Sequence, residues 1–555
     1  MTVPAQRAPE TRRPRVVMLV ANGVKGDSRV QKIAWSMAAA GWEVTLVGRA
    51  PGAEPERYRL GAAEVLLVPV PKTVSAYEGA RLRGGRRAAA LRPAYRDARA
   101  ALAGRDAAAG RRRRSRGVAA ARRYLDARPG LDALLARCSR GPLGGAAHKA
   151  LGTVFGGLDR HGGWRWFNPW FADLDLALAP VVRDLEPDLI HAHDFHMVGI
   201  GARLAAALGT DAHPVRWIYD AHEYLRGIEV PSRADIRLRM RRRMLVGVES
   251  EYIGRADAVV TVSEGIAQRL AEDHALAHRP GVILNAPVIA AGDGAIDGPI
   301  DGAIDGPIGA PGAPTANATA PRSLRADCAI AEDVPLLLYS GGMSPRRGVS
   351  TAVEALVCLP QAHLALIART DDPDIPALTE LAERLGVAER LHVVPYVPVD
   401  QVVPYISAAT IGLVPILHLP NHELSLITKY FEYLHACLPI VTSDVREMAA
   451  ETRRLAVGEV FTAGDAVDLA AAVTRVLAEP ERYRAVYAGP SDPRPASSWA
   501  GQAERLDALY RSLVTVTPGP AGDAGALELR PIEPTAPTTP TSTAQSPSPS
   551  TPAAA

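Results

Sequence analysis

The sequence predicts two doubly wound α/β domains joined by a linker, and three observations carry this prediction. Short apolar runs alternate with stretches of helical periodicity in both halves of the chain, a pattern typical of parallel sheets. Residues 294–309 repeat a Gly- and Pro-containing octad that cannot build a core, which indicates a linker. The chain has 555 residues, which is enough for two full hydrophobic cores.

Composition and charge exclude several classes of protein. Hydrophobic residues make up 47% and charged residues 22% of the chain, as in ordinary globular proteins, and the net charge of +3 is too small to indicate a nucleic-acid partner. The four cysteines are scattered without metal-ligand spacing, so we expect neither zinc nor disulfides. The N-terminus lacks an apolar signal region, and no run approaches the ~20 apolar residues of a spanning helix. We therefore expect a cytoplasmic protein.

The first domain is expected to begin with a strand at 15–20, a helix at 29–40 and a second strand at 42–47. The turn between the first strand and the helix contains Gly23 and Gly26. Each glycine would let a ligand approach the backbone, although a plain tight turn explains each one equally well.

Two later strands of this domain end in polar motifs. The strand at 187–190 leads into His191-Ala-His193-Asp194, and the strand at 215–219 leads into Asp220-Ala-His222-Glu223. Ligands of open α/β sheets bind at the carboxyl ends of strands. A single histidine is more often structural, but two such motifs in one domain favour a functional site.

An insertion at about 76–171 separates these two parts of the domain. It is rich in Ala and Arg, is broken into short predicted helices, contains Arg111 to Arg114, and ends in a cluster of Trp and Phe. Such a segment suits either a solvated helical insertion or a contact with an anionic membrane surface, and both alternatives stay open. Asp173-Leu-Asp175 is a pattern that can hold a metal, but it falls in an amphipathic run at 171–182 that favours a helix face.

The second domain offers an anion site and a candidate sugar ligand. A strand at 334–340 runs into Gly341-Gly342, and a helix is expected from residue 350, so backbone amides and two following arginines can bind phosphate. A helix at 428–436 places Lys429 and Glu432 one turn apart. Lys429 suits a phosphate and Glu432 suits sugar hydroxyls, while a surface ion pair between them is an equally weighted alternative. Residues 442–444 are expected to cap the next helix.

Several of these motifs resemble the retaining glycosyltransferase family 4, which has the GT-B fold. Lys429-Tyr-Phe-Glu432-Tyr followed by Leu438-Pro-Ile-Val is similar to the family's donor-binding signature, and Asp27-Ser-Arg29-Val and Tyr219-Asp-Ala-His222-Glu are similar to two motifs of its first domain. The resemblance covers about 14–60, 180–288 and 334–513. There are two departures. The family's first glutamate falls on Leu424, with Glu423 one residue early, and Gly342 stands at a usual arginine, with Arg346 nearby.

The resemblance implies two Rossmann-like domains facing across a cleft and transfer of a sugar, with retention, from a nucleotide diphosphate sugar to an acceptor hydroxyl. It implies no cofactor and no metal, and no nucleic-acid partner is expected. The implied catalytic residues are His222, Arg347 and Lys429. The implied donor-binding residues are Gly341, Gly342, Arg346, Arg347, Lys429, Glu432 and Glu423. The residues assigned to the acceptor side of the cleft are Gly23, Asp27, Arg29, His193 and Asp194.

Two other functions are weighed beside transfer. An epimerase of nucleotide sugars shares the fold, and a non-catalytic nucleotide-sugar-binding protein is compatible with the missing first glutamate. The predicted organisation is a disordered N-terminus at 1–13, an acceptor domain at 14–288, a linker at 289–330, a donor domain at 331–496, a crossing helix at 497–514 and a disordered tail at 515–555. The expected location is cytoplasmic, with peripheral contact at the inner face of the membrane as the open alternative.

Overall fold

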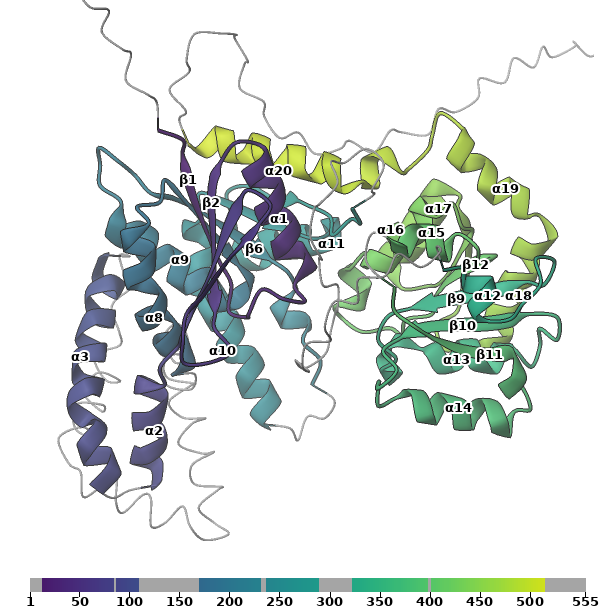
Figure 1. Ribbon diagram of the computed structural model, residues 1–555, viewed down its shortest axis with the longest axis horizontal. Coiled ribbons are helices and arrows are strands. Elements are labelled where there is room, and N and C mark those ends of the chain that lie inside the picture. The colour runs from purple at the N-terminus through teal and green to yellow at the C-terminus, as the bar shows by residue number, and fades with distance from the viewer. Residues whose placement is uncertain are drawn as a thin grey trace, which may run out of the picture. The chain divides into compact units, whose positions relative to one another are not determined.

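The computed structural model describes residues 12–83, 86–108, 169–230, 236–288, 322–397 and 401–514. These residues form two α/β domains, each built on one sheet with helices on both faces (Figure 1). The strands of both sheets are parallel apart from one edge pair. The predicted fold class of two doubly wound domains is therefore confirmed. The predicted disordered ends lie almost wholly outside the described residues.

The first sheet has the strand order β3-β4-β2-β1-β5-β6-β7-β8. Its strands are β1 Arg15–Leu19, β2 Glu43–Arg49, β3 Glu56–Leu60, β4 Ala63–Val68, β5 Leu189–His193, β6 Arg216–Ala221, β7 Ala258–Thr261 and β8 Gly281–Val282. The strand β3 pairs with β4 in the antiparallel sense, a hairpin that the sequence did not predict. Its alternating exposed and half-buried residues are largely charged, as suits the edge of a sheet.

Helices cover both faces of this sheet. One face carries α8 Trp170–Asp184, α9 Asp194–Leu208, α10 Ile236–Tyr252 and α11 Glu264–His274. The other carries α1 Ser28–Ala39 and α20 Trp499–Leu513, the last described helix of the chain. The indole of Trp42 donates to Asp507 at 2.6 Å, and that of Trp499 donates to Ser36 at 2.8 Å. The C-terminal helix is thus part of the first domain's core.

The described part of the insertion forms two helices, α2 Thr73–Arg83 and α3 Arg86–Ala108, which lie side by side (Figure 1). The second is longer than the short helices expected, and it continues past Pro93. Residues 109–168, with Arg111 to Arg114 and most of the aromatic cluster, lie outside the described residues. Contact with a membrane therefore remains a prediction. None of the described helices has both the length and the apolar character to cross a bilayer.

The Asp173-Leu-Asp175 pattern lies on α8, as expected for a helix face, and both carboxylates are buried. Asp173 accepts hydrogen bonds from the backbone amides of Val74 at 2.7 Å and Ser75 at 3.1 Å. Asp175 accepts a hydrogen bond from Arg203 at 2.7 Å and pairs with Arg105 of α3. These carboxylates therefore fasten the insertion to the domain.

The second sheet has the order β11-β10-β9-β12-β13-β14, and its strands are all parallel. They are β9 Leu336–Ser340, β10 His363–Ala368, β11 Leu391–Pro395, β12 Ile411–Val414, β13 Ile440–Ser443 and β14 Gly458–Phe461. One face packs against α13 Val349–Ala355, α14 Ile375–Arg384, α18 Ala466–Ala478 and Tyr483 of α19 Pro480–Arg484. The other packs against α12 Leu324–Asp327, α15 Val402–Ile406, α16 Thr428–His435 and α17 Arg446–Leu455.

The second domain begins earlier than the predicted residue 331. Leu324 and Cys328 are buried in its core. The guanidinium of Arg325 donates to the carbonyls of Ala331 at 2.7 Å and Ala408 at 2.8 Å. The end of the predicted 289–330 linker therefore belongs to the folded domain, because its apolar residues complete that core. Residues 289–321 lie outside the described part of the chain.

Candidate functional site

Both sheets have a point at which the strand order reverses, and the predicted site residues gather there. The reversal falls between β1 and β5 in the first sheet and between β9 and β12 in the second. Loops leaving such a pair of strands run to opposite faces of the sheet, which leaves room for a ligand at the carboxyl ends. The carboxyl ends of β1 and β5 carry four of the predicted residues: Gly23, Asp27, His193 and Asp194. The loops 341–348 and 415–427 follow β9 and β12 in the same way.

The carboxylate of Asp220 organises the site in the first domain. Asp220 lies at the end of β6 with no exposed surface. Arg29 donates from Nε to its Oδ2 at 3.0 Å and from a terminal nitrogen to its Oδ1 at 2.9 Å, and His193 Nδ1 lies 3.2 Å from Oδ2. Burial raises the pKa of Asp220, but Arg29, together with His222 and His193, outweighs burial and holds the pKa well below its usual range. Asp220 was not predicted as a site residue, although it stood in the motif that contains His222.

His222 is the partly exposed member of this cluster. Its Nε2 lies 3.4 Å from Asp220 Oδ2, and 22% of its side chain is exposed. Burial lowers the pKa of His222, but the Asp220 carboxylate more than offsets this, so its pKa is raised above the usual value. Arg29 and His193, predicted on the acceptor side, are buried and paired instead. The structure therefore places them behind His222, where they support it.

The loop before α1 is held by its own contacts. Asp27 is the N-cap of α1 and accepts a hydrogen bond from the Val30 amide, and it also accepts one from Asn22 Nδ2 at 2.8 Å. A Cβ on Gly23 would approach the carbonyl of Arg49 to 3.6 Å, an ordinary contact. Asp27 thus fixes the start of the helix that carries Arg29.

The buried cluster also contains His191, whose Nδ1 lies 2.5 Å from the hydroxyl of Tyr510 on α20. His191, His193 and Asp220 bring three potential metal ligands within 4.8 Å of one another. The Asp220 carboxylate is already engaged by the Arg29 guanidinium, so a cation there would face a buried positive charge. The group therefore fits a structural hub better than a metal site.

In the second domain, Lys429 reaches the glycine turn that follows β9. Lys429 is buried at the start of α16, and its ammonium lies 5.9 Å from the centre of the Tyr339 ring. A Cβ on Gly341 would lie 2.2 Å from Lys429 Nζ, and Gly341 has a φ of +125°. Only glycine suits this position. The predicted phosphate-binding elements are thus brought together.

Glu432 is half-buried one turn further along α16. Burial raises its pKa, while Lys429 and Lys32 act in the opposite direction. Lys32 comes from α1 of the first domain and donates to Asn285 Oδ1 at 2.9 Å and to the Ala286 carbonyl at 2.6 Å. Asn285 Nδ2 in turn donates to Thr428 Oγ1 at 3.1 Å. Lys32 was not predicted, because its nearness to Glu432 depends on packing between distant segments.

The two departures from the family signature have structural counterparts. Leu424, at the register of the missing glutamate, is buried, and its carbonyl accepts a hydrogen bond from Ser263 Oγ at 2.5 Å. Glu423 pairs with His418 at 2.6 Å and accepts from the Arg446 amide at 2.9 Å. Glu423 therefore caps α17, and the prediction that residues 442–444 cap this helix is wrong, since the N-cap is Val445 without a side-chain bond.

Arg346 and Arg347 lie in the turn before α13, as predicted. Arg346 is exposed and forms an ion pair with Glu229 at 3.1 Å. Arg347 is half-buried, and Gly342 has no atom within 4 Å of the position of an added Cβ. Both arginines help lower the pKa of His422, although burial is the larger cause. The turn is therefore a positively charged neighbour of the 415–427 loop.

Lys32 makes a pH-dependent contribution to stability that can be measured. Burial, assisted by Arg29, lowers its pKa to about 7. The unfolded chain, with a lysine pKa of about 10.4, then binds more protons between these values, so the free energy of unfolding should rise with pH across that interval. Urea unfolding at about pH 7 and about pH 9 should show this rise in the wild type but not in Lys32→Met. Lys25→Met, at an exposed lysine, should keep it. A rise of equal size in Lys32→Met would contradict the assignment.

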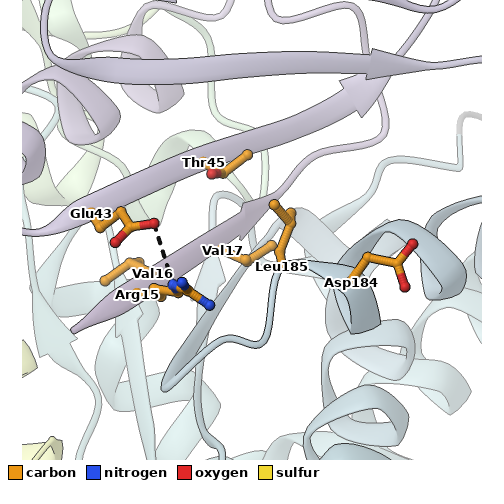
Figure 2. A pocket seen from close by; sticks show the side chains of 7 residues that line it. All are labelled: Arg15, Val16, Val17, Glu43, Thr45, Asp184 and Leu185. Atoms are coloured by element: carbon orange, nitrogen blue, oxygen red, sulfur yellow. Dashed lines mark ion pairs between the residues drawn. The ribbon is translucent and has the colours of Figure 1, made fainter. Parts of the chain in front are cut away.

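A cavity of about 160 Å³ lies elsewhere, at the amino ends of β1 and β2 (Figure 2). Arg15 and Glu43 form an ion pair of 3.3 Å beside it, and Asp184 also lines it. Ligands of doubly wound sheets bind at the carboxyl ends of the strands, which lie on the opposite side of the sheet from this cavity. No predicted site residue lines this cavity, so we do not assign the site to it.

Comparison with known proteins agrees with this geometry. Residues 334–479 match the family model described as glycosyl transferases group 1, and residues 116–286 match that of glycosyltransferase family 4. Each of the two domains therefore contains a stretch that matches a glycosyltransferase family model. The first match contains the Gly341 turn, Lys429 and Glu432, and the second contains His193, Asp220 and His222.

Individual proteins similar to this chain are distant. D-inositol 3-phosphate glycosyltransferase 1 of Catenulispora acidiphila is 26% identical over 204 residues, which is 34% of this chain and 47% of the relative. The chain thus spans about half the length of this relative. Sucrose-phosphate synthase from Thermosynechococcus elongatus has a TM-score of 0.56 at 16% identity, covering 90% of this chain and 99% of that one. The Anabaena protein HepE in complex with UDP and glucose has a TM-score of 0.50 at 13% identity, covering 90% and 100%. These likenesses show the GT-B fold.

Proposed function

We propose that this glycosyltransferase moves a sugar from a nucleotide diphosphate sugar to an acceptor hydroxyl, with retention and without a metal ion. The observation that carries the proposal is the approach of Lys429 to the Gly341 turn at the switch point of the second sheet, with Glu432 one turn later. A lysine ammonium beside a glycine turn, with a carboxylate one helical turn later, suits a diphosphate followed by a ribose.

The chemistry follows from these charges. The bond between the sugar's anomeric carbon and the diphosphate oxygen breaks, and the electron pair leaves with the diphosphate. The side chains of Lys429 and Arg347 stabilise that developing charge, so the protein can take the part that a metal plays elsewhere. In a retaining transfer the acceptor enters on the face the diphosphate leaves, and a phosphate oxygen can accept its proton. His222, held by Asp220, orients the sugar at the reacting carbon.

The comparisons suggest which substrates to try first. HepE is described in complex with UDP and glucose, and the Catenulispora relative is named for D-inositol 3-phosphate. We propose UDP-glucose as the first donor and a phosphorylated ring alcohol as the first acceptor. NMR of the product would reveal the anomeric configuration, and an inverted product would contradict retention. Loss of turnover on treatment with EDTA would contradict the metal-free proposal.

The donor site is tested by calorimetric titration with UDP. Glu432→Gln keeps the shape of the side chain and removes its charge. A charge-assisted hydrogen bond is worth about 1.5–3 kcal/mol, so the Kd should rise about tenfold or more. Glu423→Gln is the matched control, because that carboxylate caps α17 and should affect thermal stability more than UDP affinity. Wild-type affinity in Glu432→Gln would refute the donor-site assignment.

Nucleotide release distinguishes the three functions that share this fold. A transferase releases UDP from UDP-glucose when the acceptor is added. An epimerase converts the donor sugar without an acceptor and releases none. A binding protein retains UDP-glucose unchanged. Release that does not depend on any acceptor would indicate hydrolysis and contradict the proposal.

A further inference from the structure

Four side chains lie in a row near His222, at the carboxyl ends of the strands of the first sheet. Arg49 ends β2, Trp170 begins α8, and Asp194 and His196 lie in the first turn of α9. The guanidinium carbon of Arg49 lies 5.9 Å from the centre of the Trp170 ring, and that ring lies 5.5 Å from the His196 ring. His196 Nδ1 lies 2.9 Å from Asp194 Oδ2. The row thus joins a cation, an indole, an imidazole and a carboxylate.

The row is open to solvent to a similar degree along its length. The exposed fractions are 28% for the Asp194 side chain, 24% for His196 and 22% for His222. Arg49 and Trp170 are also half-buried. This differs from the neighbouring Arg29, His193 and Asp220, which are buried. A ligand can therefore touch the row without disturbing the core.

Asp194 has a strained backbone, and its side chain is stabilised as a carboxylate. It has a φ of +65°, in the left-handed region that residues other than glycine rarely adopt. Its Oδ1 accepts a hydrogen bond from the Phe195 amide at 2.6 Å. Burial raises its pKa, but the bond from His196 and the nearby charges of His196 and His222 outweigh this and lower the pKa. Asp194 therefore presents a carboxylate close to His222, which suits the hydroxyls of an acceptor.

Arg49 supplies the other end of the row. Its Nε is buried and has no hydrogen-bond partner, and no described carboxylate forms an ion pair with its side chain. A half-buried guanidinium without an anion is unfavourable unless a ligand completes it. Arginine binds phosphate oxygens through several N–H groups at once. The Trp170 ring offers a flat apolar face beside this cation.

We propose that these four residues form the acceptor subsite, and that the acceptor is a polyhydroxylated ring carrying a phosphate. The ring lies against Trp170, its hydroxyls bond to Asp194 near His222, and its phosphate pairs with Arg49. This inference rests on the proposed transferase function and adds the residues that bind each part of the acceptor.

The test is calorimetric titration of the full chain, saturated with UDP, with five probes: D-inositol 3-phosphate, glucose 6-phosphate, inositol, glucose and inorganic phosphate. At least one phosphorylated ring should bind at least tenfold more tightly than its unphosphorylated form and than inorganic phosphate. Arg49→Gln should remove that advantage and leave UDP affinity unchanged. Trp170→Leu should weaken binding of the ring with and without phosphate. Arg57→Gln, at an exposed arginine of the β3 edge, is the control and should change nothing.

Three results would overturn the inference: equal affinity of Arg49→Gln and wild type for the phosphorylated ring, no preference for phosphate in the wild type, or binding of inorganic phosphate as tight as that of the rings. Failure of the proposed function would show instead as a loss of UDP binding or of its dependence on Glu432. The two failures are therefore distinguishable. Circular dichroism and the Tm of each variant establish that the losses do not reflect unfolding.

Discussion

Asp220→Ala should lower the free energy of unfolding by about 3–5 kcal/mol, the usual range for removing one partner of a buried ion pair. Arg29 is 4% exposed, and Asp220 is the carboxylate to which it donates two hydrogen bonds. The variant leaves a guanidinium charge in the core, with one remaining bond to the Ile283 carbonyl at 2.7 Å. Urea unfolding monitored by circular dichroism measures the loss.

Glu64→Ala is the matched control, because Glu64 pairs with Arg57 at 2.8 Å at the exposed edge of the same sheet. Exposed pairs contribute about 0–1 kcal/mol, so the free energy of unfolding of this variant should stay near that of the wild type.

A milder variant, Asp220→Asn, retains the side-chain volume and should lower the pKa of His222, because the carboxylate that raises this pKa is gone. An NMR titration of His222 would contradict the hub if its pKa did not fall.

Gly341→Ala should lower kcat/KM with the nucleotide sugar by about 10²–10³-fold, the scale for losing one preorganised charge partner of a transition state. The added methyl carbon would lie 2.2 Å from Lys429 Nζ, so the ammonium must move away from the turn. The φ of +125° adds strain for any side chain. UDP affinity should fall with the rate, since the same ammonium is proposed to bind the diphosphate in both states.

Gly342→Ala is the control from the next position, where an added Cβ meets no atom within 4 Å. It should keep UDP affinity and turnover near the wild type. Comparison of the two Tm values separates a local displacement of Lys429 from a loss of the domain. If Gly341→Ala kept its UDP affinity, Lys429 would not be the diphosphate contact.

The parts of the fold that could be predicted are those with strong local signals. The helix Thr428–His435 agrees with the predicted 428–436, since Pro439 follows shortly after and cannot continue a helix. The cap of α11 is a local signal of the same kind, because the Ser263 hydroxyl accepts a hydrogen bond from the amide three residues later. The β3–β4 hairpin was missed because its charged residues do not resemble a buried strand.

The parts of the site that could not be predicted depend on contacts between distant segments. Arg29 and Asp220 are 191 residues apart in the chain, so no local pattern reveals that they form one buried pair. The cap of α17 comes from Glu423, which lies 23 residues before Arg446. Lys32 meets Asn285 over 253 residues. Sequence motifs indicated which residue types belong to the site, and tertiary packing decides which of them touch.

The position of α20 has a consequence for the order in which this protein can fold during synthesis. Trp499, Leu506 and Tyr510 of α20 fill the core on one face of the first sheet, although the strands of that sheet all come from residues 15–282. Domains generally fold as units while the chain emerges from the ribosome, N-terminal part first. In this protein the first domain cannot complete its core until α20 is made. One apolar face of its sheet stays uncovered while more than two hundred further residues are translated. A nascent chain stalled before residue 499 should therefore be a target for chaperones.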